Sequence, residues 1–304
     1  MIDDAILAAI EARLVRAGAL PATRLRPFAV DGVALGVVDD DRAARLARFD
    51  CFRVTGEAVA LEARLATART RSAAIAEVAA VLRSEGALPA WRNELFAVAR
   101  DLGDAPVFLI ERGAARYFGV VTYAAHVNGV TQLGNAAHVN GVAQSGGQPG
   151  MWLARRSPRK AVDPGLLDNL VGGGIGAGFR VVETVVKEAW EEAGIEPALA
   201  RRSRPAGVLH SRRAMPDGLQ REVLFVHDLA LPPDFVPVNR DGEAVEHRLV
   251  SLAEAGQAIA ATGPPDEVTP DASLVVLDYL IRQGTIRPDK PRYRVLAGLG
   301  RSPL

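Results

Sequence analysis

Three glutamates are spaced so that their carboxylates share one side of a helix. Glu188, Glu191 and Glu192 are related by steps of three and four residues within VVETVVKEAWEEAG, and residues three and four apart lie on the same helical face. Mg²⁺ or Mn²⁺ offsets the repulsion among such carboxylates, because these ions prefer oxygen ligands and bridge them to substrate phosphates. The spacing therefore makes a divalent metal site one interpretation, with Lys187 pairing with Glu191. Isolated glutamates would instead form a solvated face.

A glycine-rich turn, GGGIGAG, precedes this helix. Glycine lets the backbone approach a phosphate without a Cβ, and the turn delivers the helix N-terminus to the site. We predict that Gly173 and Gly174 contact substrate. A nucleotide-binding turn is excluded, because the GK[ST] ending is absent and Phe179 stands where GxGxxG needs its last glycine.

Charged residues on both sides of this segment complete the candidate site. In RRSPRK, Arg156 and Lys160 are expected to bind phosphate, since a guanidinium fork matches phosphate oxygens; solvated surface charges are the alternative. Lys187 is a further candidate for substrate binding. In NRDGEAVEHRLV, Glu243 and Glu246 are candidates for a general base or an additional ligand, the alternative being a polar turn before a strand.

The whole segment resembles the Nudix box: a glycine, five residues, a glutamate, seven residues, then Arg-Glu-apolar-any-Glu-Glu-any-Gly-apolar. The matching positions are Gly173, Glu188, Ala189, Glu191, Glu192, Gly194 and Ile195. Lys187 replaces the arginine, which keeps the charge but loses the bidentate fork. Phe179 replaces the first glutamate; Glu183, one turn later, either compensates or is a surface residue.

The resemblance implies a metal-dependent hydrolase of diphosphates that uses Mg²⁺ or Mn²⁺. It assigns Glu188, Glu191 and Glu192 to the metal and gives Glu191 or Glu192 a catalytic role in relaying the proton. Because Phe179 removes one acidic group, a module that binds a diphosphate without cleaving it is the alternative.

Longer strings, from about Trp91 to Gly284, resemble the Nudix portion of fungal thiamine pyrophosphokinase. They include RNELFAV, FLIERGAARYFGVVTYAAHVNG and VHDLALPPDFVPVNRDGEAVEHRLV. That branch carries an extra N-terminal domain, and its box lacks the first glutamate and has lysine before the next one. The resemblance implies hydrolysis of thiamine diphosphate, or a damaged analogue, to the monophosphate and phosphate. A nucleoside diphosphate derivative is the alternative substrate.

Mixed strand and helix patterns surround the box. MWLARRS predicts a strand, PAGVLHSRR and LQREVLFVHDL a hairpin, and SLAEAGQAIAAT and SLVVLDYLIRQG two helices. The expected fold class is α/β (α+β): a Nudix α/β/α sandwich with a mixed sheet, preceded by a smaller α+β domain. We predict an N-terminal domain at residues 1–112, a Nudix domain at 113–285 and a polar tail at 286–304.

Two internal repeats lie before the box. GALPATRLRPFAV (Gly18–Val30) and GALPAWRNELFAV (Gly86–Val98) share nine of thirteen positions, which favours a duplicated unit over chance punctuation by Gly and Pro. AAHVNGV begins at Ala124 and again at Ala136, and its Asn-Gly pairs indicate a hairpin extension. His126 and His138 in these copies are either metal ligands or products of recent duplication, which is the favoured interpretation.

The charge balance limits the partners. Thirty-six basic and thirty-six acidic residues leave no formal net charge among 304 residues, so neither nucleic acid nor a membrane surface is an expected partner. A small-molecule diphosphate is expected, and a homodimer is possible. A single cysteine, Cys51, excludes an internal disulfide, and no signal-peptide pattern opens the sequence; we expect a cytoplasmic protein.

Overall fold

The computed structural model describes residues 2–20, 22–133 and 148–304. Its largest element is a seven-stranded mixed sheet in the order β11-β12-β7-β8-β13, with β10 paired to β7 and β9 to β8. β12 and β7 run parallel, and the other pairs are antiparallel. The strands are β7 (Val121–Gln132), β8 (Pro149–Arg156), β9 (Leu167–Asn169), β10 (Val171–Gly174), β11 (Arg204–Met215), β12 (Gly218–Ala230) and β13 (Ala244–Ser251).

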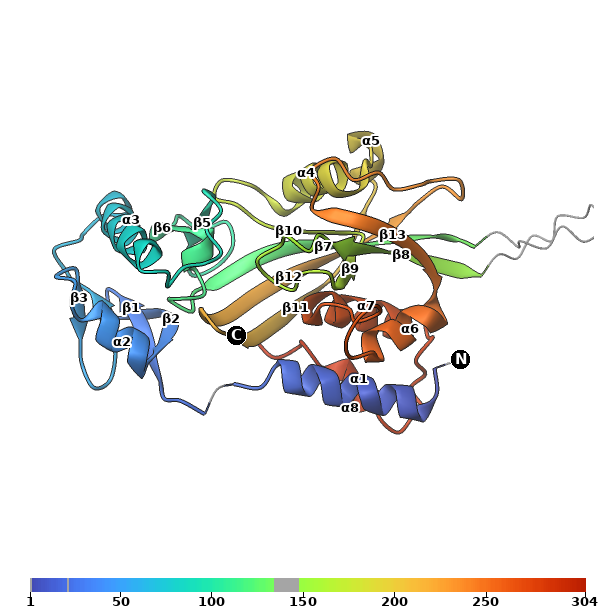
Figure 1. Cartoon of the computed structure of the whole chain (residues 1–304), viewed down its shortest axis with the longest axis horizontal. Coiled ribbons are helices and arrows are strands. Elements are labelled where there is room, and N and C mark those ends of the chain that lie inside the picture. Colours follow the sequence, from blue (N-terminus) through green and yellow to red (C-terminus); the bar gives the residue numbers. More distant parts are fainter. Residues whose placement is uncertain (1, 21, 134–147) are drawn as a thin grey trace, which may run out of the picture.

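Helices cover both faces of this sheet (Figure 1). On one face lie α4 (Val181–Ala193) and the short α5 (Pro197–Ala200); on the other lie α6 (Leu252–Ala260) and α7 (Pro270–Arg282). α4 buries Val185, Ala189 and Ala193 against the sheet, because apolar residues recur at helical spacing on that side. The glutamates therefore lie on its remaining faces. The predicted α/β/α sandwich with a mixed sheet is confirmed.

The N-terminal region has its own core. Its four-stranded sheet has the order β2-β1-β4-β3, and β5 and β6 form a separate pair. Phe28, Phe108 and Phe118 are fully buried together. The elements are β1 (Leu25–Val30), β2 (Val33–Asp39), α2 (Asp40–Leu46), β3 (Phe52–Val54), β4 (Val59–Leu61), α3 (Ala68–Ser84), β5 (Leu95–Val98), β6 (Phe108–Glu111) and the 3-10 turn η1 (Arg112–Ala114).

The longer repeat has the same local structure in both copies. Each copy follows a helix, leads into a strand (β1 or β5) and continues into an antiparallel partner (β2 or β6). Phe28 and Phe96 occupy equivalent positions and are both buried. The duplication itself stays a prediction.

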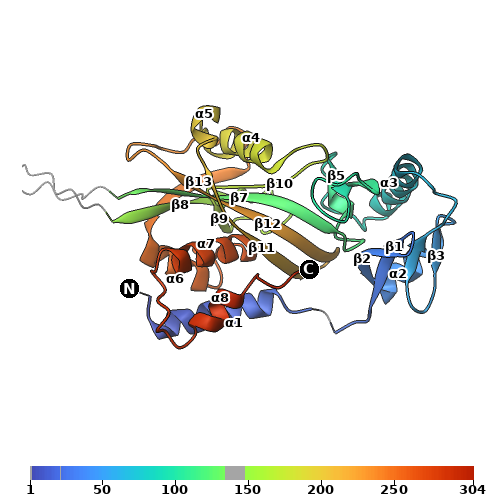
Figure 2. The same ribbon diagram turned by 180° about the vertical axis from the view of Figure 1, so that it is seen from behind.

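Both ends of the chain pack under the larger sheet, as the view from behind also shows (Figure 2). α1 (Asp4–Ala17) is capped by Asp3, whose side chain accepts a hydrogen bond from the Ile6 N–H. Its buried side chains join those of α6 and α7 in one cluster. The segment predicted as a polar tail contains α8 (Tyr293–Gly298), and its Leu296 is buried in the same cluster. The boundaries at residues 112 and 285 stay predictions.

We expect Ile10→Ala in α1 to lower the free energy of unfolding by about 2–5 kcal/mol. Ile10 is fully buried against the helices under the larger sheet, so truncation leaves a cavity in that core. Val15→Ala is the matched control: Val15 lies in the same helix but is 54% exposed, and its change should stay within about 0.5 kcal/mol. Urea unfolding measures both. Equal small effects would contradict the packing of α1.

Other local predictions are confirmed. MWLARRS lies in β8, the hairpin is β11–β12, and the two late helices are α6 and α7. Gly194 ends α4 in the left-handed conformation, at φ 65°. The first AAHVNGV copy lies in β7; the second copy, with His138, lies outside the described residues. No helix in the described part of the chain has the length and apolar character that crossing a bilayer requires.

Candidate active site

The glycine turn and α4 bring two of the three predicted glutamates together. The backbone N–H of Gly172 donates to Glu192 Oε2 at 2.8 Å. A Cβ added to Gly173 would lie 2.4 Å from the Glu188 carboxyl carbon, so the missing side chain provides the space for that carboxylate. Burial raises the pKa of Glu188, and burial together with the Glu188 charge raises the pKa of Glu192.

Glu191 lies on the neighbouring face of α4, outside the cavity described below. It pairs with Lys187 at 2.8 Å, as the spacing of four predicts, and Lys187 also contacts Glu188 at 3.0 Å. Burial opposes the charge of Lys187, but these hydrogen bonds outweigh it and raise the pKa of the lysine. Lys187 therefore orients Glu188 from outside the cavity.

The departure at Phe179 leaves no acidic group in the glycine turn that precedes α4. Phe179 is 48% exposed there. Glu183 accepts hydrogen bonds from the backbone and guanidinium of Arg180, at 2.9 and 2.7 Å. Its carboxylate thus caps the helix, and the structure does not bring it to the other glutamates.

Two further carboxylates, Asp241 and Glu243, come from the loop before β13. One carboxylate oxygen from each of Glu192, Asp241 and Glu243 lies within 4.8 Å of the others. Glu243 is one of the predicted candidates; Asp241, two residues earlier, was not predicted. Lys160 forms an ion pair with Glu243, and burial lowers the pKa of Lys160.

A cavity of about 160 Å³ opens beside these groups and is lined by residues of both the larger sheet and the N-terminal region. Of the predicted residues, its lining includes Arg156, Lys160, Gly173, Gly174, Glu188 and Glu243. Arg156 also pairs with Asp168 at 2.7 Å. His126 lines the cavity, with Nδ1 2.9 Å from Asn169 Oδ1.

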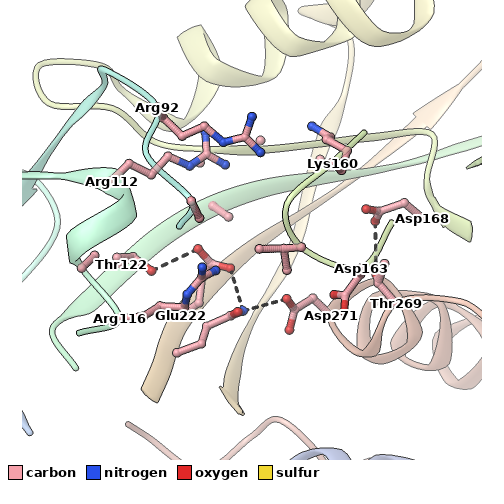
Figure 3. A pocket seen from close by; sticks show the side chains of 18 of the residues that line it. Arg92, Arg112, Arg116, Thr122, Lys160, Asp163, Asp168, Glu222, Thr269 and Asp271 are labelled. Carbon is pink, nitrogen blue, oxygen red and sulfur yellow. Dashed lines mark hydrogen bonds between the residues drawn. The ribbon is translucent and has the colours of Figure 1, made fainter. Parts of the chain in front are cut away.

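One side of this cavity is basic (Figure 3). Lys160 lies there with Arg92 and Arg112, which sequence reasoning missed. Arg112 pairs with Glu94 at 2.8 Å. Burial and the neighbouring Arg112 charge lower the pKa of Arg92. The only available signal was indirect: both arginines fall in the strings that resemble the thiamine-related branch.

The opposite side is acidic and was also missed. Glu222, Asp271 and Asp163 lie there, together with Arg116, which pairs with Asp217 at 2.5 Å. Arg213 pairs with Asp163 at 2.7 Å, whereas Glu222 accepts hydrogen bonds from Thr122 and Gln220 at 3.0 and 3.3 Å. Burial raises the pKa of Glu222, and Asp271 adds to this effect.

The structure does not bring Glu246 to the cavity. Its carboxylate pairs with Arg155 at 2.6 Å and Arg248 at 2.5 Å, and hydrogen bonds from Arg248 and then Arg155 lower the pKa of Glu246. Both oxygens are engaged by cations, which makes this carboxylate a poor base.

We expect Glu246→Gln to leave turnover of a diphosphate substrate within about threefold of wild type, because Glu246 lies outside the cavity. Glu243→Gln should lower kcat by at least about tenfold, since it removes a carboxylate in a position to act as base or ligand. Initial rates with Mg²⁺ across a pH series compare the two. A large loss of turnover in Glu246→Gln alone would mean that Glu246, and not Glu243, is the base or ligand.

The residues present fit a hard divalent cation. Glu188, Glu192, Asp241 and Glu243 offer only carboxylate oxygens, the donors that Mg²⁺ and Mn²⁺ prefer. Burial raises the pKa of both Glu188 and Glu192, and the Glu188 charge adds to this effect at Glu192, so a bound cation would favour the ionised form of both. The space left by Gly173 accommodates the Glu188 carboxylate.

The chain belongs to the Nudix hydrolase family. Residues 134–272 match the NUDIX domain model, and residues 8–122 match a domain of unknown function, DUF4743. Nudix hydrolase 24, chloroplastic, of Arabidopsis thaliana is 37% identical over 270 residues, or 88% of this chain and 70% of that protein.

Two further relatives are similar over shorter shares of their length. Nudix hydrolase 20, chloroplastic, of Arabidopsis thaliana is 37% identical, over 77% of this chain and 59% of its own length. A Saccharomyces cerevisiae protein is 32% identical, over 67% of this chain and 58% of its own. Among solved structures, one from Deinococcus radiodurans aligns with a TM-score of 0.42 and 20% identity, over 61% of this chain and 98% of that one. The 37% identity to Nudix hydrolase 24 over most of both chains makes this protein a Nudix-type hydrolase.

Proposed function

We propose that this protein hydrolyses an organic diphosphate, thiamine diphosphate or a damaged analogue of it, to the monophosphate and phosphate. The supporting observation is the composition of one cavity. Glu188 lies at its edge, in the space left by Gly173, and a basic side faces an acidic side. Basic groups suit the phosphates, and acidic groups suit a positively charged organic part. The resemblance to the thiamine pyrophosphokinase branch gives the substrate class.

The phosphates would lie along the basic side. Arg156 and Lys160 are placed to bind phosphate oxygens, and the bare backbone at Gly173 and Gly174 lets the chain approach them closely. Glu188, Glu192 and Asp241 would hold Mg²⁺ or Mn²⁺. A bound ion of this kind neutralises the diphosphate and lowers the pKa of a water molecule.

Glu243 is the proposed base. It lines the cavity and approaches Glu192, so it can accept a proton from the attacking water. The water oxygen then forms a bond to one phosphorus, the bridging P–O bond breaks, and its electrons leave on the other phosphate. The Lys160 ammonium, paired with Glu243, holds that carboxylate toward the cavity.

The organic part would face the acidic side. Thiamine carries a positively charged thiazolium ring and an aminopyrimidine, which donates hydrogen bonds. Glu222, hydrogen-bonded to Thr122 and Gln220, has no basic partner among the described residues. Its carboxyl group is therefore available to interact with such a heterocycle.

The test is hydrolysis by purified protein with Mg²⁺ or Mn²⁺ of a panel comprising thiamine diphosphate, its 4-oxo analogue, ADP-ribose and a nucleoside diphosphate. We expect monophosphate and phosphate from the thiamine compounds, with higher kcat/KM than for the others. Preference for the nucleotide compounds would overturn the substrate assignment. Release of no product from any diphosphate would overturn the proposed activity.

Two further predictions belong with this proposal. A cytoplasmic location and a homodimer are proposed from the sequence; the two Arabidopsis relatives are named chloroplastic. Sedimentation of the purified protein decides the oligomeric state.

A further inference from the structure

The second repeat copy (Gly86–Val98) packs directly against the glycine turn of the hydrolase domain. The backbone N–H of Ala177 donates to the Leu95 carbonyl at 2.8 Å. A Cβ at Gly174 would lie 2.6 Å from Phe96 and 3.3 Å from the Arg112 guanidinium carbon. The N-terminal region therefore packs against the same turn whose other side holds Glu188.

This contact places two arginines over the cavity. Glu111, which is buried, accepts hydrogen bonds from the backbone N–H groups of Arg92 at 2.7 Å and Gly113 at 3.2 Å. One carboxylate thus joins the loop that carries Arg92 to the turn that begins with Arg112. Both guanidinium groups point into the cavity from the basic side (Figure 3).

Arg92 has no internal role that would explain its position. Within residues 2–20, 22–133 and 148–304, no hydrogen bond or ion pair engages its guanidinium. The charges of Arg112 and Arg156 disfavour its charged form, whereas the charge of Glu94, which pairs with Arg112 at 2.8 Å, favours it. Like charges at one cavity wall repel, so an unpaired arginine there implies an anionic ligand. Phosphate oxygens match a guanidinium in charge and geometry.

The other repeat copy offers a comparison within the same molecule. Arg24 is the counterpart of Arg92 in the aligned repeats. Arg24 lies within 3.5 Å of Glu57 and is about half exposed, and it does not line the cavity. Equivalent residues thus have different surroundings, and only the second copy faces the carboxylates of α4.

We propose that the N-terminal region completes the active site, with Arg92 and Arg112 binding the phosphates of the substrate opposite Glu188. This inference rests on the proposed function, because it assigns residues to the same cavity. It gives the N-terminal region a role in substrate binding. Arg92 and Arg112 are then substrate-binding residues supplied across a domain contact.

The test compares four variants of the full chain: Arg92→Ala, Arg112→Ala, Arg92→Lys and Arg24→Ala. We expect Arg92→Ala and Arg112→Ala to raise KM for thiamine diphosphate, and to weaken calorimetric binding of methylenediphosphonate, by at least about tenfold. Arg92→Lys should recover part of the loss, and Arg24→Ala should match wild type. Because Arg92 is unpaired, its truncation should leave the Tm unchanged.

Methylenediphosphonate separates the two proposals, because it binds without being hydrolysed. If wild type cleaves no diphosphate, the proposed function fails, while weaker binding by Arg92→Ala still supports the arginine assignment. Binding and KM of Arg92→Ala within about twofold of wild type, in a protein that does cleave diphosphates, would overturn the inference. If Arg112→Ala lowers the Tm, the cause is the lost pair with Glu94. The binding and KM of Arg92→Ala then decide whether the inference holds.

Discussion

Glu192→Gln is expected to lower kcat by at least about a hundredfold, since losing even a residue that only supports a metal ligand costs about ten- to a hundredfold. Glu192 is the point where the glycine turn, α4 and the loop before β13 meet. Glutamine preserves the acceptor for the Gly172 N–H but removes the charge. Steady-state rates with thiamine diphosphate and Mg²⁺ measure the loss.

A second readout distinguishes loss of the ion from loss of the fold. Burial and Glu188 raise the pKa of Glu192, so removing its charge should not lower the Tm in EDTA. Added Mg²⁺ should raise the Tm of wild type, because the ion binds the folded state, and this increase should shrink in Glu192→Gln. Glu183→Gln, a control on the part of α4 that does not line the cavity, should keep both the rate and the Mg²⁺ response. An unchanged rate in Glu192→Gln would overturn the assignment.

The fold was largely predictable because its signals are local. The spacing of Val185, Ala189 and Ala193 determines which face of α4 is buried, and Gly194 fixes its end. The packing of α1 was not predictable. Its apolar stripe shows that one face is covered, but which helices cover it depends on contacts such as Ile10 with the core under α6 and α7, more than 200 residues away.

The candidate site was predictable only where it follows from one helix and one turn. Glu188 and Glu192 lie four residues apart, and their partners Gly172 and Gly173 lie in the adjoining motif. Helical spacing alone could not separate Glu191 from them, since its position depends on the rotation of α4 against the sheet. Arg92 reaches the cavity through tertiary packing, and no local sequence pattern predicts that position.

Gly173→Ala is expected to lower kcat/KM by about a hundredfold, because misplacing a reacting group by about 1 Å can cost that much. The added Cβ would lie 2.4 Å from both Cγ and Cδ of Glu188, so that side chain must leave its place. Gly173 is outside the left-handed region; the backbone accepts alanine, and the loss arises from the displaced carboxylate. Kinetics with thiamine diphosphate measure the effect.

A double-mutant cycle shows whether Glu188 transmits the effect. Glu188→Ala removes the carboxylate, so adding Gly173→Ala to it should cause little further loss if the clash with Glu188 is the cause. Additive losses would mean that alanine acts elsewhere, for example on the approach of phosphate to the backbone. Gly56→Ala is the control, since its new Cβ would meet nothing within 4 Å and activity should not change. Non-additivity would show that the glycine of the box is needed because it leaves room for the first carboxylate of α4.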